Sequence, residues 1–221
     1  MSRHYIPPPV SQIEPNLFIA DVLDTYKEHN LSDNRISVVV SLSDGRLALW
    51  RQQKFLRHVT PERHMYIECL DNSTQDLIKY AEDFCNFLDK FLSPSSSPTH
   101  EGSTETSPIQ HIALVHCQRG RSRAPTLVTA YLMRKYQRTH QDILADLKLK
   151  RKIVKPNPNF IEQLEVWHQV QYNLWEDDDK TIPKEPYRAY LERRAERLKA
   201  KGLTGDEPIV PATLDEPFIR P

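Results

Sequence analysis

The stretch His116-Cys117-Gln118-Arg119-Gly120-Arg121-Ser122-Arg123-Ala124-Pro125 lies between two segments of different hydrophobic pattern. Before it, residues 112–115 (IALV) are a short apolar run that predicts a buried strand. After it, residues 124–136 are typical of a helix, and proline is well tolerated in a first helical turn. Gly120 gives the backbone between the predicted strand and helix the freedom to close a tight loop. The stretch therefore predicts a nest of backbone N–H groups that binds an anion at a helix N-terminus.

The remaining chain alternates predicted strands with predicted helices. Short apolar, β-branched runs predict further strands over 37–42 and 64–70. Apolar residues at helical spacing predict further helices over 77–92, 141–149 and 160–175. This order is typical of an α/β fold, a three-layer sandwich with a central, mostly parallel sheet flanked by helices.

We expect one domain over residues 10–175, after an N-terminal extension over 1–9. Residues 93–108 are too rich in Ser, Thr and Pro to pack, which predicts a flexible insertion. Residues 176–221 are predicted to form a charged helix near 184–201 and a disordered tail. The apolar stripe of that helix, which indicates packing against the domain, consists of Tyr187, Tyr190, Leu191 and Leu198.

Composition narrows the classes of function. The 30 basic and 30 acidic residues cancel, so no global field favours nucleic acid. The three cysteines, Cys69, Cys85 and Cys117, fit neither a disulfide framework nor a zinc site. With no signal-like N-terminal run and no apolar run of about 18 residues, we expect a cytoplasmic or nuclear protein without a membrane span. The sequence leaves the oligomeric state open.

The predicted nest would change the chemistry of Cys117. Inward N–H groups, the helix dipole and a nearby arginine favour the thiolate, which is the nucleophilic form of cysteine. Arg123 is placed to fold back and make bidentate contacts with phosphate oxygens. A buried structural cysteine is the alternative, but three arginines around Gly120 argue against it, because core turns do not gather unpaired charge.

His116 to Arg123 match HCxxGxxR, and the chain thereby resembles the dual-specificity branch of the cysteine-based protein tyrosine phosphatases. Residues 13–21 are similar to that family's opening strand, and 156–164 to its closing helix. The resemblance implies Cys117 as nucleophile, Arg123 as transition-state clamp and His116 as a support for the loop. It also implies that the phosphoryl group binds to the loop of Gln118, Arg119, Gly120, Arg121, Ser122 and Arg123.

The acid that such a reaction needs is predicted upstream. Asp71 follows a predicted strand and precedes the helix at 77–92, which resembles the setting of the family's acid loop. Its implied role is acid in the first half-reaction and base for water in the second. Two alternatives stay open: Asp71 only caps the following helix, or Asp76 is the acid.

The resemblance implies hydrolysis of phosphotyrosine and phosphoserine or phosphothreonine in phosphoproteins, through a cysteinyl phosphate and with no metal or cofactor. Two departures from the family pattern keep alternatives open. Ala124 stands where the family usually has Ser or Thr, whose hydroxyl assists release of the thiolate. This departure predicts slow turnover and keeps a phosphoprotein-binding module as an alternative. Arg119 and Arg121 add cations that would suit an anionic phosphorylated small molecule, such as a phosphoinositide or an inositol pyrophosphate.

Overall fold

The computed structural model describes residues 8–45, 50, 52–93 and 110–209. In that part of the chain one sheet has five strands in the order β1-β2-β5-β3-β4. Strand β1 pairs antiparallel with β2, and every other pair is parallel, so the prediction of a mostly parallel sheet is confirmed. The strands are β1 (Val10–Glu14), β2 (Leu17–Asp21), β3 (Val38–Ser43), β4 (His64–Glu68) and β5 (Ala113–Cys117).

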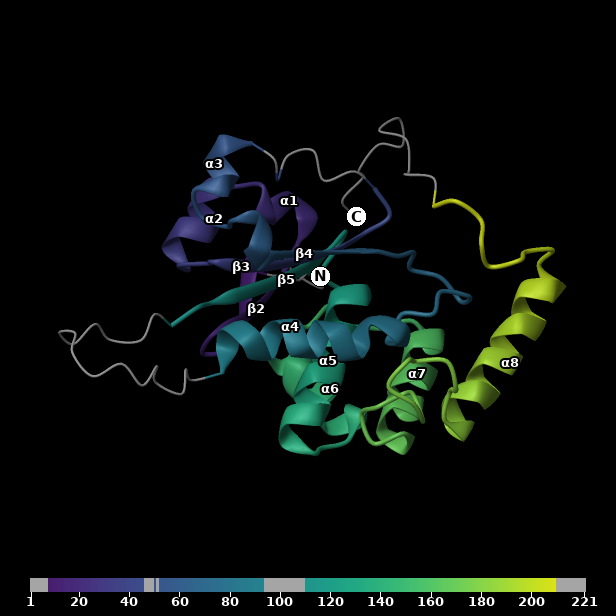
Figure 1. The fold of residues 1–221 in the computed structure, drawn as a ribbon. Helices are drawn as coiled ribbons and strands as arrows, with labels where there is room; N and C mark the ends of the chain where they lie inside the picture. The colour runs from purple at the N-terminus through teal and green to yellow at the C-terminus, as the bar shows by residue number, and fades with distance from the viewer. Residues whose placement is uncertain (1–7, 46–49, 51, 94–109, 210–221) are drawn as a thin grey trace, which may run out of the picture.

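Helices cover both faces of the sheet, which confirms the three-layer sandwich (Figure 1). One face carries α1 (Val22–Thr25), α2 (Glu28–Asp33) and α3 (Gln53–Leu56). The other carries α4 (Ala81–Leu92), α5 (Arg123–Tyr136), α6 (His140–Lys150) and α7 (Pro158–Gln169), with α8 (Glu185–Ala200) beside α7 at the edge. Two short 3₁₀ helices, η2 (Pro61–Arg63) and η3 (Ile78–Tyr80), precede β4 and α4. Among the described residues, no helix combines the length and the apolar character that crossing a membrane requires.

Strand β5 and helix α5 form the centre of the fold. Every residue of β5 is buried, as expected of a strand with neighbours on both sides and helices on both faces. Helix α5 is buried from Arg123 to Met133 and packs against α4, α6 and α7. The loop between β5 and α5 is therefore held at both ends by the most deeply buried elements of the molecule.

Two predicted elements differ from the structure. The opening strand predicted at 13–21 is a hairpin of β1 and β2, because Pro15 and Asn16 form a turn that interrupts the strand. The helix predicted at 160–175 runs from Pro158 only to Gln169. Gln171 and Tyr172 have positive φ angles of 53° and 62°, which cannot continue a right-handed helix. The other predicted elements differ from the structure only at their ends.

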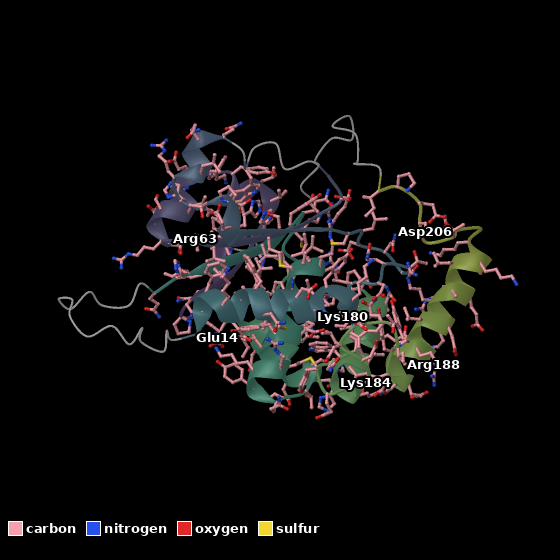
Figure 2. The ribbon with its side chains drawn as sticks, viewed as in Figure 1. Glu14, Arg63, Lys180, Lys184, Arg188 and Asp206 are labelled. Atoms are coloured by element: carbon pink, nitrogen blue, oxygen red, sulfur yellow. The ribbon has the colours of Figure 1, made fainter. Side chains whose placement is uncertain are left out.

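The C-terminal helix packs against the domain, as its apolar stripe predicted. Tyr187, Tyr190 and Leu198 are buried, and Leu191 packs against the main core. In the connector before α8, Lys180 lies beside α4, where it forms ion pairs with Glu82 and Asp83 (Figure 2). Most of the predicted extension (1–7), insertion (94–108) and disordered tail (210–221) lies outside the described residues.

Candidate active site

The cysteine loop, residues 117–123, joins the buried end of β5 to the start of α5. Cys117 is the last residue of β5 and is 2% exposed. Arg123 is the first residue of α5, so the N–H groups of the first helical turn open toward the loop. The helix dipole adds partial positive charge at the same end. This combination is the anion-binding arrangement that the sequence predicted.

Gly120 lets the loop pass close to the neighbouring strand. Its φ angle is +58°, a left-handed conformation that costs other residues free energy. A Cβ atom at this position would lie 2.5 Å from the carbonyl oxygen of Ala20 in β2. Glycine is therefore required here both by the backbone conformation and by the close approach.

Arg151 holds the same loop from beneath. Its side chain is fully buried, and its Nε donates a hydrogen bond to the Gly120 carbonyl over 3.0 Å. Its Nη1 donates to the hydroxyl of Ser11 in β1, also over 3.0 Å. Nothing in the local sequence distinguishes Arg151 from the surface cations around it, so sequence reasoning missed this residue.

Arg123 is 2% exposed, which is rare for a cation without partners. Its Nη1 donates to the carbonyl oxygen of Cys69 over 2.8 Å and lies 3.7 Å from the carboxylate of Asp44. Its Nε has no hydrogen-bond partner among the described residues. The side chain is thus fixed from one side, while Nε can donate to an anion.

Asp71 lies beside the cysteine loop. Its Oδ1 accepts hydrogen bonds from the Ser122 hydroxyl over 2.9 Å and from Nδ2 of Asn157 over 2.7 Å. The Ser122 hydroxyl also accepts a bond from the Asn157 backbone N–H over 3.2 Å. Since both side-chain bonds to Asp71 end on Oδ1, Oδ2 can face a ligand.

Asp71 and most of the cysteine loop line one cavity of about 440 Å³. Cys117, Arg123 and Asp71, predicted from three separate places in the sequence, all contribute to its wall. Of the predicted loop residues, Gly120 is not part of the lining, and it contributes through the backbone geometry described above. The lining consists of Asp71, Cys117, Gln118, Arg119, Arg121, Ser122, Arg123, Lys155, Pro156, Asn157 and Pro158.

Asp76, the alternative acid, does not line the cavity. It is 5% exposed and accepts a hydrogen bond from the Tyr187 hydroxyl over 2.8 Å. Burial raises the pKa of its carboxyl group. The geometry therefore favours Asp71 over Asp76 as the carboxylate that meets a ligand.

His116 is fully buried against Ser41 and Trp50 and does not line the cavity. Its Nε2 is 2.6 Å from the Ser41 hydroxyl, which is 2.8 Å from Nε2 of His64. The ring of Trp50 stacks on His116 with the ring centroids 5.8 Å apart. Burial lowers the pKa of His116 to about 3 and that of His64 to about 4, so both rings are neutral at pH 7. A neutral, buried His116 is suited to support of β5 and unsuited to proton transfer with a ligand.

Besides Arg151, sequence reasoning missed three further contributors to the cavity and its support. Lys155 lines the cavity, and its backbone N–H donates to the Arg121 carbonyl over 2.8 Å. Asn157, which reads as a helix cap before Pro158, also binds Asp71. An Asn-Pro pair is a typical signal for the start of a helix, but no sequence signal indicates the contact with Asp71. Ser41 gave no signal, because it lies within an apolar strand.

No metal centre is evident in the described residues, where no group of three or more His, Cys, Asp or Glu side chains is arranged to hold an ion. All three cysteines are free thiols. Burial raises the pKa of the Cys69 thiol to about 12, which leaves it protonated and unreactive at neutral pH.

Comparison with known proteins identifies the family of this arrangement. Residues 17–170 match the model of the dual specificity phosphatase catalytic domain. Tyrosine-protein phosphatase yvh1 of Schizosaccharomyces pombe is 28% identical over 185 residues, which is 84% of this chain and 47% of that protein. The Slingshot homolog of Xenopus laevis is 26% identical over 162 residues, or 72% of this chain and 20% of that protein.

The fold comparison agrees. The crystal structure of the Yvh1 phosphatase domain from Chaetomium thermophilum matches with a TM-score of 0.60 and 25% identity, over 73% of this chain and 96% of that domain. The chain spans about half the length of the yvh1 protein and a fifth of the Slingshot homolog. The family model covers both Asp71 and the cysteine loop. The chain belongs to the dual specificity phosphatase catalytic-domain family.

Proposed function

We propose that the protein is a dual-specificity phosphatase that hydrolyses phosphotyrosine and phosphoserine or phosphothreonine in phosphoproteins. The observation that carries this proposal is the convergence of Cys117, Arg123 and Asp71 on one cavity, from the end of a strand, the start of a helix and a distant loop. A nucleophile, an anion clamp and a proton donor are the three groups that hydrolysis through a covalent intermediate requires.

In the first half-reaction, the Cys117 thiolate attacks phosphorus and forms an S–P bond while the P–O bond to the leaving group breaks. The loop N–H groups and the Arg123 guanidinium bind the equatorial phosphoryl oxygens, where charge develops in the transition state. Asp71 donates its proton to the departing oxygen. Arg123 suits this role because Nη1 is already held by Cys69, so little side-chain freedom is lost on binding.

In the second half-reaction, a water molecule attacks the cysteinyl phosphate. Asp71, now ionised, takes a proton from the water, while the water oxygen bonds to phosphorus and the S–P bond breaks. Inorganic phosphate leaves, and Cys117 returns to the thiolate. A site that depends on a free thiol suits a reducing compartment, the cytoplasm or nucleus.

A second candidate function is supported by the charge at the cavity mouth. Arg119, Arg121 and Lys155 are exposed and line the cavity, although the whole chain is neutral. Three cations in addition to Arg123 exceed what one phosphate monoester needs. This excess favours a substrate with several phosphates, such as a phosphoinositide or an inositol pyrophosphate.

The deciding experiment measures phosphate release from an aryl phosphate, phosphotyrosine and phosphothreonine peptides, phosphoinositides and inositol pyrophosphates. Turnover of peptides that is lost in Cys117→Ser supports the first proposal. Turnover confined to the polyanions, and reduced in Arg119→Gln and Lys155→Gln, supports the second. Stoichiometric protection of a phosphopeptide without turnover would contradict both and identify a phosphoprotein-binding module.

A further inference from the structure

The acid loop, residues 71–77, has little structure of its own. It follows β4 and Cys69-Leu70, precedes η3, and contains no helix or strand. Its internal hydrogen bonds come mainly from Asn72, whose Oδ1 accepts from the backbone N–H groups of Thr74 and Gln75. A loop without a regular ladder is positioned by whatever packs against it. The position of Asp71 therefore depends on contacts from outside the loop.

Helix α8 supplies direct contacts along one side of this loop. The Tyr187 hydroxyl donates to the Asp76 carboxylate over 2.8 Å. Nε of Arg194 donates to the Thr74 carbonyl over 2.7 Å. Past the helix end, Nζ of Lys201 donates to the Ser73 hydroxyl over 2.7 Å. These contacts join residues 73–76 to a segment more than 100 positions later in the chain.

Helix α8 also acts through two buried amides of α7. Gln163 accepts from the backbone N–H groups of Leu77 and Ile78 and donates to the Gln75 carbonyl, each over 2.8 Å. Asn159 donates to the same carbonyl over 2.8 Å. The Tyr190 hydroxyl accepts from Gln163 over 2.7 Å and donates to Asn159 over 3.3 Å. Tyr190 thereby fixes the orientation of both amides that hold the loop.

Breaking the contact between Tyr187 and Asp76 costs free energy, because both side chains are buried. Tyr187 is 2% exposed and Asp76 is 5% exposed. Oδ1 of Asp76 has no hydrogen-bond partner among the described residues, so the Tyr187 hydroxyl is the side-chain donor that satisfies this buried carboxylate. Without it, the carboxylate would have to move toward water, and the loop would move with it.

We infer that α8 is a positioning element for the acid loop, and that Tyr187 and Arg194 are positioning residues that hold Asp71 where a leaving oxygen departs. The family match ends at residue 170, so this bracing lies beyond the matched catalytic domain. This inference rests on the proposed function, in which Asp71 donates a proton to the leaving group.

The test uses the full chain with Tyr187→Phe and Arg194→Met, which each remove one hydrogen bond to the loop and keep most of the packing. Arg193→Met is the matched control, because Arg193 is on α8 but pairs with Glu162 of α7 and does not contact the loop. We measure kcat/KM, which reports the first half-reaction, on two aryl phosphates, one with a strongly acidic phenol and one with an ordinary phenol. Only the second leaving group needs a proton from Asp71.

We expect kcat/KM on the ordinary phenyl phosphate to fall about tenfold in Tyr187→Phe, the loss expected for one hydrogen bond to a charged group. The activated substrate and the Arg193→Met control should stay within about twofold of wild type, since neither depends on the braced loop. Adding Tyr187→Phe to Asp71→Asn should cost nothing further, because residues that act as a unit are not additive. Equal losses on both substrates, or additive losses, would overturn the inference.

A second measurement does not depend on turnover. Hydrogen exchange of the backbone N–H groups at residues 72–78 should be about tenfold faster in Tyr187→Phe and unchanged in Arg193→Met. If no phosphate ester is hydrolysed by the wild-type chain, the proposed function fails, while faster exchange would still show that α8 holds the loop. Unchanged exchange in Tyr187→Phe would overturn the positioning role by itself.

Discussion

The Ser122 hydroxyl donates a hydrogen bond to the Asp71 carboxylate over 2.9 Å, although the two residues are 51 positions apart in the chain. Ser122 belongs to the cysteine loop and Asp71 to the acid loop, so this bond joins the two halves of the candidate site. Asn157 reinforces it by binding both residues. The predicted nucleophile and the predicted acid are thus linked through a serine that faces the same cavity.

Removal of the acid should affect substrates according to their leaving group. In Asp71→Asn, we expect kcat/KM, which reports the first half-reaction, to fall by about 10²–10⁴-fold on an ordinary aryl phosphate, the usual contribution of a general acid. The phosphate ester of a strongly acidic phenol should show a much smaller loss, because that phenol departs without a proton. Ser122→Ala keeps the carboxyl group and should show a weaker form of the same pattern. Equal losses of kcat/KM on both substrates would exclude Asp71 as the acid.

Replacement of Arg123 by lysine should retain the positive charge and remove the planar guanidinium group that binds two phosphoryl oxygens at once. Two charge-assisted hydrogen bonds to a phosphoryl group become one point contact, so kcat/KM should fall by roughly 100-fold. Arg134→Lys is the control, because Arg134 lies at the far end of α5 and pairs with Asp89. Urea unfolding of both variants separates folding from catalysis. Wild-type kcat/KM in Arg123→Lys would show that bidentate binding is not needed.

Gly120→Ala should destabilise the protein and abolish activity. The added methyl would lie 2.5 Å from the Ala20 carbonyl oxygen. The alanine would also have to adopt a left-handed backbone conformation, which by itself costs about 1–2 kcal/mol. Gly202→Ala is the matched control, since Gly202 has a φ of +66° but nothing within 4 Å of an added Cβ. The difference in the free energy of unfolding between the two variants measures the close contact. Equal destabilisation would mean that the loop can move away from β2.

Acid should destabilise the fold through His116. Its ring is fully buried with a pKa of about 3, against about 6.5 when unfolded. Between these values the unfolded state binds more protons, so stability is complete above about pH 6.5 and falls as pH decreases. The loss from His116 alone should approach 2 kcal/mol at about pH 5. Urea unfolding at pH 7 and pH 5 measures it.

The control for this pH dependence is a comparison of two asparagine variants. His116→Asn should reduce the dependence of the unfolding free energy on pH, whereas His29→Asn, at an exposed position, should preserve it. A wild-type free energy of unfolding that is the same at pH 7 and pH 5 would contradict a buried, neutral His116.

Ala124 should slow the second half-reaction. Its side chain is fully buried at the first turn of α5, next to Arg123, and it offers no hydroxyl to stabilise the departing thiolate. Rapid mixing with an aryl phosphate should therefore show a burst of leaving group that approaches one equivalent, followed by a slower steady rate. Ala124→Ser should shorten the lifetime of the phosphoenzyme and raise the steady rate. Equal burst and steady rates in the wild type would contradict slow breakdown.

Local sequence patterns determined the architecture and the central loop. Apolar runs and helical spacing predicted the mostly parallel sheet between helix layers, because burial imposes those periodicities on each element separately. Residues 112–136 predicted the strand, loop and helix around Cys117 and Arg123, since all of their determinants are close in the chain. Turns were predicted less well: the turn at Pro15-Asn16 and the early end of α7 depend on a few residues and their tertiary contacts.

Tertiary structure alone decided which distant residues complete the site. Arg151 beneath the loop, Lys155 at the cavity mouth and Asn157 on Asp71 carry no signal of those contacts in the sequence, because each contact depends on how separate elements pack. The same holds for Tyr187 of α8, whose stripe predicted packing but not the bond to Asp76. A periodic pattern records that a face is buried, whereas the partner of a buried polar group is fixed only when the whole chain has folded.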